Sequence, residues 1–129
     1  MNLINTKRLD AVLEKARESE RLRMNDNFHD ALDAPAQRLL NALEVGTKLP
    51  IHRHQHTAET YILLRGKLAV VFYDDNKIET ERVILNPKTE DYGVHIPIGQ
   101  WHTIEVLDSS VIFEVKDGPY TPLELSDIL

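Results

Sequence analysis

Two segments that carry histidine lie far apart in this sequence, and only a chain that wraps back on itself can bring them together. The first places metal-capable side chains between two glycines, in the order Gly46, His52, His54, Glu59 and Gly66. The second reads Pro-x-Gly-x-x-His and ends at His102. If the intervening strands wrap into a barrel, three imidazoles and one carboxylate can meet at one metal ion. The spacing therefore predicts a metal site and constrains the fold.

The first segment owes this geometry to the two-residue period of a strand. His52 and His54 point to the same face of an extended chain, while Arg53 turns away. A polar bend follows, and Glu59 then opens an apolar strand that we expect Gly66 to end, so that the carboxylate can face back toward the two rings. The alternative is a group of ordinary polar residues near a turn. The second histidine segment favours metal binding.

The remaining pattern indicates an all-β protein with one helix at its start. Asn5 or Thr6 can cap this helix. Its apolar side chains recur at helical spacing: Leu9, Val12, Leu13 and Ala16. Eight strand candidates follow, at residues 37–43, 49–54, 60–65, 68–73, 79–85, 93–97, 101–107 and 111–116. The strands are antiparallel, with hairpin turns expected at residues 74–77 and 108–110, and so many short strands suit a closed or double-sheet barrel.

We expect a single domain over residues 1–129, because this length suits one domain and neither a repeat nor a linker divides it. Residues 1–36 would form the helix and a polar loop, and residues 37–116 the barrel. Residues 117–129 would form a tail that wraps the barrel and ends in a short helix.

The composition narrows the classes of function. The absence of cysteine excludes disulfides, thiolate zinc sites and cysteine nucleophiles, so a metal must be held by nitrogen and oxygen. A net charge of −6 argues against a general nucleic-acid binder, because phosphate contacts need a basic excess. No apolar run is long enough to span a membrane, and residues 1–15 lack the apolar core of a signal peptide. We therefore expect a cytoplasmic protein without a membrane partner.

The two histidine segments resemble the motifs of the cupin family. The first matches Gly-x5-His-x-His-x4-Glu-x6-Gly at every defined position, and the second matches at Pro97, Gly99 and His102. Asp91 and Val106 stand where the second cupin motif has Gly and Asn. The resemblance implies a small single-domain cupin, a jelly-roll barrel also described as a double-stranded β-helix. It implies four metal ligands: His52, His54, Glu59 and His102.

A closer resemblance extends over nearly the whole chain. Residues 23–29, 35–46, 52–54 and 113–120 resemble the WbuC-type cupin-fold metalloproteins. Members of that family are often associated with bacterial surface-polysaccharide gene clusters. This implies a ligand derived from a sugar or a nucleotide sugar, without defining a reaction.

Three imidazoles and one carboxylate suit a divalent transition metal such as Fe, Mn, Ni or Zn, and they leave positions for exchangeable water. Two classes of function remain open. One is a metal-dependent isomerase, epimerase, lyase or oxygenase; the other is a non-catalytic module in which the metal orients a sugar or carboxylate ligand.

His95 lies two residues before Pro97, so the two side chains share one face of a strand. If that face points into the barrel, His95 can serve as an acid or base. The alternative is a plain strand residue.

Four further residues are candidates for contacts with an anionic, sugar-derived small molecule. Arg38 and Lys116 carry groups that bind carboxylate or phosphate, although each can form a surface salt bridge instead. Asn25 and His29 lie in a turn-rich stretch that can close over the barrel mouth, although turn formation alone also explains the asparagine. His56 is expected to be exposed.

We expect a homodimer for two reasons. The edges of an antiparallel sheet are usually paired or covered, and the apolar stripe of the helix needs a surface against which it can be buried.

Overall fold

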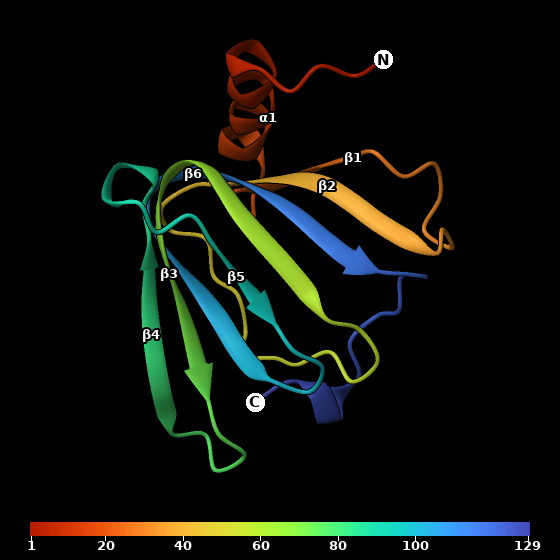
Figure 1. Cartoon of the computed structure of the whole chain (residues 1–129), viewed down its shortest axis with the longest axis vertical. Coiled ribbons are helices and arrows are strands. Elements are labelled where there is room, and N and C mark those ends of the chain that lie inside the picture. The colour runs from red at the N-terminus through yellow and green to blue at the C-terminus, as the bar shows by residue number, and fades with distance from the viewer.

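The structure, a computed structural model, describes residues 1–129 and consists of one α-helix packed against a strongly bent sheet (Figure 1). The helix α1 spans Thr6–Glu18. The strands in chain order are β1 (Arg23–Asn27), β2 (Ala36–Leu43), β3 (Glu59–Tyr73), β4 (Glu79–Leu85), β5 (Gly93–Ile96) and β6 (Trp101–Asp117). Two 3₁₀ helices, η1 (Pro87–Thr89) and η2 (Leu125–Asp127), lie between β4 and β5 and in the C-terminal tail. No helix combines the length and the apolar character needed to span a bilayer.

The antiparallel pair of β3 and β6 organises the sheet. The strand order is β1-β2-β6-β3-β4, and every pairing is antiparallel. On the edge of β3 that faces away from β6, the strand β5 pairs with the first part of β3 and β4 pairs with its last part. The register sets Glu59 opposite Lys116 at one end of the long pair and Tyr73 opposite Trp101 at the other. This is the all-β architecture with an N-terminal helix that the sequence predicts.

Two predicted strand ends are wrong, because β3 and β6 each continue through them. Gly66 lies inside β3, where the register shifts on both sides of it, and residues 108–110 lie inside β6 rather than in a hairpin turn. Gly66 has φ +100°, and a Cβ added there would lie 2.3 Å from Ser109 O. The residue therefore permits a close approach of the two backbones that bends the paired strands without ending them.

Residues 49–54 do not form the predicted strand. Within this segment only His52 makes isolated strand-like pairs, with His102 on one side and Ile128 on the other. The segment is therefore a loop that is held at one residue between β6 and the C-terminal tail, which places the ligand-bearing part of the loop at a fixed position.

The strand β1 was not predicted, because its polar sequence resembles a loop. It pairs with β2 residue by residue, from Arg23 opposite Leu43 to Asn27 opposite Leu39. Met24 packs against the cluster beneath α1, while Asn27 is exposed. An edge strand needs only one apolar face, so tertiary pairing overrides the weak local propensity.

The helix α1 buries its apolar stripe against its own chain. Asn5 is the N-cap, and its side chain accepts a hydrogen bond from Arg8 N at 3.0 Å. The stripe packs on side chains from β2 and β6, which include Leu40, Ala42 and Val111. A second apolar cluster fills the inside of the bent sheet, with these buried members: Leu43, Tyr61, Leu63, Leu68, Val70, Leu85, Ile96, Ile104 and Ile112. The stripe thus needs no partner molecule to become buried.

Candidate metal centre

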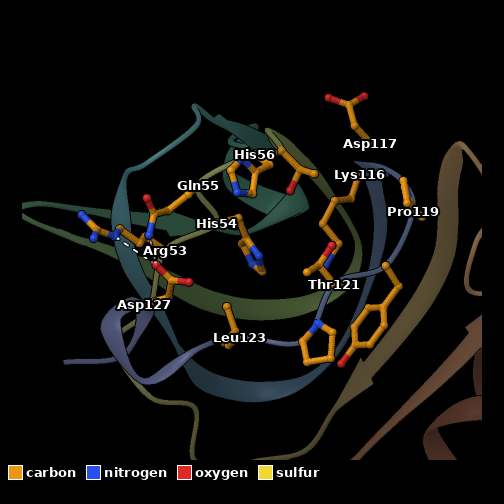
Figure 2. Close-up of a pocket in the computed structure, with 13 residues that line it drawn as sticks. Arg53, His54, Gln55, His56, Lys116, Asp117, Pro119, Thr121, Leu123 and Asp127 are labelled. Carbon is orange, nitrogen blue, oxygen red and sulfur yellow. Dashed lines mark hydrogen bonds and ion pairs between the residues drawn. The ribbon is translucent and has the colours of Figure 1, made fainter.

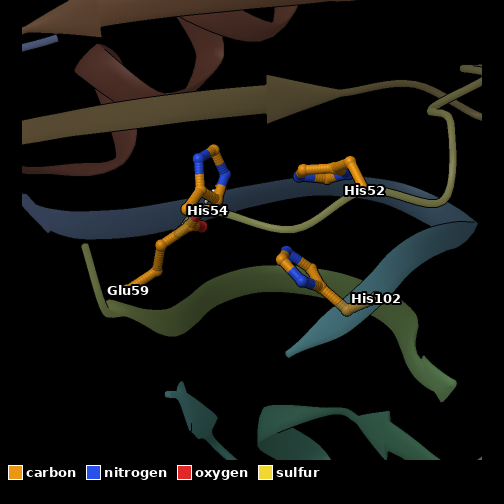
Figure 3. Close-up of side chains that lie close together, drawn as sticks. All are labelled: His52, His54, Glu59 and His102. Carbon is orange, nitrogen blue, oxygen red and sulfur yellow. Dashed lines mark ion pairs between the residues drawn. The ribbon is translucent and has the colours of Figure 1, made fainter. Parts of the chain in front are cut away.

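The four predicted ligands meet at one point (Figure 3). The donor atoms of His52, His54, Glu59 and His102 all lie within 4.8 Å of one another. The ring centroid of His52 is 5.1 Å from that of His54 and 4.4 Å from that of His102. Glu59 and His102 are buried, and the other two side chains are half-buried. Three imidazole nitrogens and one carboxylate oxygen gathered in this way could hold a divalent transition metal.

Backbone pairing explains how the two distant segments converge. His52 N donates a hydrogen bond to His102 O at 3.0 Å, and His102 N donates to His52 O at 2.9 Å. Residues that exchange both bonds project their side chains to the same face. His54 is held by a third bond, which its carbonyl accepts from Gly99 N at 2.8 Å. Because Gly99 has φ +80°, its turn docks the Pro-x-Gly-x-x-His segment onto the His-x-His segment.

Further hydrogen bonds fix how two of the rings face the cluster. His52 Nδ1 lies 2.9 Å from Pro50 O, and His102 Nδ1 lies 2.9 Å from Gln100 O. A carbonyl oxygen only accepts, so each Nδ1 carries the proton and each Nε2 presents its lone pair. His102 Nε2 is buried and has no hydrogen-bond partner in the protein. A buried polar atom without a partner costs free energy, and a metal ion at this point would satisfy it.

The electrostatics of the cluster keep the donor groups in their metal-binding forms. Burial, assisted by the neighbouring His102 ring, lowers the pKa of His52 to about 4. Burial likewise lowers the pKa of His102. Burial would raise the pKa of Glu59, but the contact of its Oε1 with His54 Nε2 outweighs this and lowers the pKa. At neutral pH these side chains are two neutral imidazoles and a carboxylate, which are the forms that bind metal.

A pocket opens between the loop that carries His54 and the C-terminal tail (Figure 2). His54 belongs both to this pocket and to the metal cluster, and the side chains of Lys116 and Thr121 point into it. The Asp117 carboxylate points away from it. As predicted, His56 is exposed and lies outside the cluster.

Among the four residues predicted to contact a ligand, only Lys116 lines this pocket. The register sets Lys116 opposite Gln37, so the next residue, Arg38, faces the other side of the sheet and is exposed. Asn25 is exposed on the edge strand β1, and His29 Nδ1 accepts a hydrogen bond from Arg38 N at 3.2 Å. None of Arg38, Asn25 and His29 lines the pocket, so their contact with a ligand stays a prediction.

His95 does not point into the barrel, contrary to the expectation for an acid or base. The register sets Ile96 opposite Glu59 and His95 opposite Thr60. Ile96 is consequently part of the interior cluster, whereas His95 is exposed on the opposite face, with Nδ1 2.9 Å from Thr60 Oγ1. His95 is thus the plain strand residue that was the alternative.

One buried carboxylate beside the cluster was not predicted. Glu114 is 8% exposed, its Oε2 lies 3.8 Å from Lys116 Nζ, and its Oε1 accepts a long hydrogen bond from Asn41 Nδ2 at 3.5 Å. Burial, reinforced by the negative charge of Glu59, raises the pKa of Glu114 to about 7. The sequence pattern could have indicated that Glu114 is buried, since it is the single charged residue in the apolar run 111–115. A carboxylate is seldom buried in such a run without a specific role.

Comparison with known protein families shows the family of this chain. A model of the family described as "Domain of unknown function (DUF6016)" matches residues 4–85. The chain belongs to this family. The DUF6016 match includes His52, His54 and Glu59 and ends before His102. No curated protein matches the chain.

Solved structures show that this DUF6016 chain has the cupin fold. It aligns with a cupin superfamily protein from Desulfitobacterium hafniense DCB-2 at 14% identity and a TM-score of 0.58, over 74% of this chain and 76% of that one. The capsular polysaccharide assembling protein CapF from Staphylococcus aureus aligns at 20% identity and a TM-score of 0.61, over 78% of this chain but only 29% of CapF. KdgF from Halomonas sp. aligns at 16% identity and a TM-score of 0.59, over 77% and 82% of the two chains. Identities this low establish a shared fold alone.

Proposed function

We propose that this protein is a metal-dependent cupin that holds one divalent transition metal, Fe, Mn, Ni or Zn, through three histidines and one glutamate. The observation that carries the proposal is the buried, unpartnered Nε2 of His102, which faces three further donor atoms. When bound, the metal would polarise a carbonyl group or activate a water molecule. The residues present fit such an ion, because nitrogen and oxygen donors suit all four metals.

The rest of the site contributes orientation and binding. Pro50 O and Gln100 O hold the rings of His52 and His102 with Nε2 toward the cluster. Lys116 places a cation on the pocket side of the cluster, where it would orient an anionic ligand. The chain therefore supplies a fixed donor set next to a pocket for a small molecule.

The ligand, in this proposal, is derived from a sugar or nucleotide sugar, and the protein acts in surface-polysaccharide metabolism as a metalloenzyme. The resemblance of the sequence to WbuC-type cupins supports this context. The fold shared with CapF, described as a capsular polysaccharide assembling protein, is compatible with it. The pocket wall also carries hydroxyl groups from Thr57, Tyr120 and Thr121, which suit a ligand rich in hydroxyl groups.

A second candidate is a binding module in which the metal orients a sugar or carboxylate ligand and no reaction follows. The observation that favours it is the position of His95, which removes the predicted acid or base from the site. Glu114 is then a buried carboxylate beside the metal cluster that is not itself a predicted ligand.

One experiment separates these functions. The protein is purified without a chelating resin, its native metal is measured, and nucleotide-sugar intermediates are screened for turnover and for thermal stabilisation. Turnover that disappears with a chelator and returns with the native metal supports the enzyme. Stabilisation without turnover supports the binding module. A protein that neither retains nor rebinds a metal overturns both.

A further inference from the structure

Lys116 has an unusual position for a lysine, since its side chain is only 16% exposed. It lies opposite Glu59 in the register of β3 and β6, so the two side chains share the face on which the metal cluster lies. Figure 2 shows the Lys116 side chain pointing into the pocket, toward the His54 side. The ammonium group is thus placed between the cluster and the pocket.

The ammonium group of Lys116 lacks a close anionic partner. Its one ion pair is with Glu114, whose Oε2 lies 3.8 Å from Nζ, beyond hydrogen-bonding distance. A largely buried charge without hydrogen bonds is costly, and removing it from water is compensated only by close, well-oriented partners. An anionic group that entered the pocket would supply them.

The charges around the pocket also favour an anion. A divalent ion and Lys116 together outweigh Glu59 and Glu114 by one positive charge, even if both carboxylates are ionised. The other cation on the wall, Arg53, is neutralised by Asp127, with Nε 3.4 Å from Oδ1. Asp117 also lines the pocket, but its carboxylate is directed outward (Figure 2). A ligand with one negative charge would complete the balance.

The donor groups on the pocket wall indicate which anion. Phosphate sites usually combine several donors, such as a helix N-terminus or an arginine fork. The pocket lining contains no helix N-terminus of that kind, and its arginine is already paired. One ammonium group beside threonine and tyrosine side chains suits a carboxylate on a hydroxylated skeleton.

We propose that Lys116 is the anion-binding residue of the pocket and that the ligand is a small hydroxylated carboxylate, which contacts Lys116 and the metal together. This inference rests on the proposed metal-dependent function and names the class of ligand for the same site.

The test is calorimetric titration of the metal-loaded protein with three probes that share one skeleton: D-glucuronate, D-glucose and D-glucose 6-phosphate. Glucuronate should bind, and glucose should bind at least about 10-fold more weakly, because a charge-assisted hydrogen bond contributes roughly 1.5–3 kcal/mol. Lys116→Met should weaken glucuronate binding by about 10-fold or more, and Lys116→Arg should restore part of it. Arg38→Met is the matched control and should leave binding unchanged, because Arg38 is exposed on the opposite face.

The metal content of every variant is measured alongside binding. If wild-type protein holds no metal, the proposed function fails and the inference with it. If metal is retained but Lys116→Met binds glucuronate like wild type, or glucuronate does not bind, the inference is overturned and the metal site stands. Tighter binding of glucose 6-phosphate than of glucuronate overturns the carboxylate assignment.

Discussion

His54 and His56 lie two residues apart on one loop, yet only His54 belongs to the metal cluster. Replacing His54 with alanine should reduce metal occupancy and lower the melting temperature. A bound ion stabilises the folded state by mass action, by about 2.7 kcal/mol when its concentration is 100-fold above Kd. His56→Ala should change neither property, because His56 is exposed outside the cluster. Metal analysis and melting curves check both variants, and equal metal loss would identify His56 as a ligand.

Residue positions in the site were predictable where the argument was local. His52 and His54 share a side because they are two residues apart, and Glu59 follows them at the start of the next strand, whereas adding His102 requires a chain that wraps back on itself. The direction of His95 stayed open in the sequence because the face of a strand residue depends on the register with a neighbouring strand, and a shift of one residue reverses every side chain. The register is set by pairing between distant segments, which the local pattern does not contain.

Glu114 gives the folded state a pH dependence of known sign. Its pKa is raised from 4.5 to about 7, so between these values the folded state binds a proton that the unfolded state does not. The stabilisation is present at low pH and is lost as the pH rises through about 7. From pH 5 to pH 8, wild type should therefore lose on the order of 2 kcal/mol of unfolding free energy relative to Glu114→Gln, which cannot ionise.

Urea unfolding of metal-free protein at the two pH values measures this difference. The matched control is Glu81→Gln, since Glu81 is exposed on β4 and should behave like wild type. Parallel pH dependence in wild type and Glu114→Gln would show that another group titrates in this range.

At the scale of elements, the ligand-bearing loop is held on two sides. His52 pairs with β6, and on the other side Arg53 N donates to Asp127 O at 3.0 Å. The Asp127 carboxylate also accepts a hydrogen bond from Gln55 Nε2 at 2.5 Å, and Leu129 N donates to the backbone of the loop. The C-terminal tail therefore positions His52 and His54 without contributing a ligand.

Asp127→Ala should loosen this loop and weaken metal binding by about 10-fold, the lower end of the effect seen when the groups that support metal ligands are removed. Ser126→Ala is the control, because Ser126 is exposed and only its backbone carbonyl meets Arg53. Competition titration with a chromophoric chelator gives both affinities. Unchanged metal affinity in Asp127→Ala would mean that β6 alone fixes the loop.

The elements themselves were predicted better than their ends. The helix and the strand at residues 79–85 follow from local periodicity, and the antiparallel pairing of that strand with the preceding one follows from the turn expected at residues 74–77. The interruption expected at Gly66 is present, but as a bulge within one long strand, because β6 continues beside it and keeps the pairing. Whether a glycine ends a strand or bends it depends on this partner, which a single sequence does not identify.

At the scale of the whole molecule, one of the two reasons for expecting a homodimer no longer applies. The stripe of α1 is buried against β2 and β6 of the same chain, so it does not call for a partner. The edge strand β4 exposes Glu79, Glu81 and Arg82, and charged edges discourage strand pairing between molecules. We therefore expect a second copy to meet the chain through a surface other than the β4 edge and the α1 stripe.

The outer face of β3 is the surface that suits a second copy. Ile62 and Leu64 are 40% and 38% exposed, whereas Phe113, opposite Ile62 on β6, is half-buried against the cluster beneath α1. Apolar side chains that remain exposed together in mid-sheet favour association. We predict that light scattering at micromolar concentration gives twice the chain mass of 14.8 kDa and that Ile62→Arg halves it. Ile98→Arg, at an exposed loop position, should remain dimeric, and a wild-type mass of 14.8 kDa would contradict the dimer.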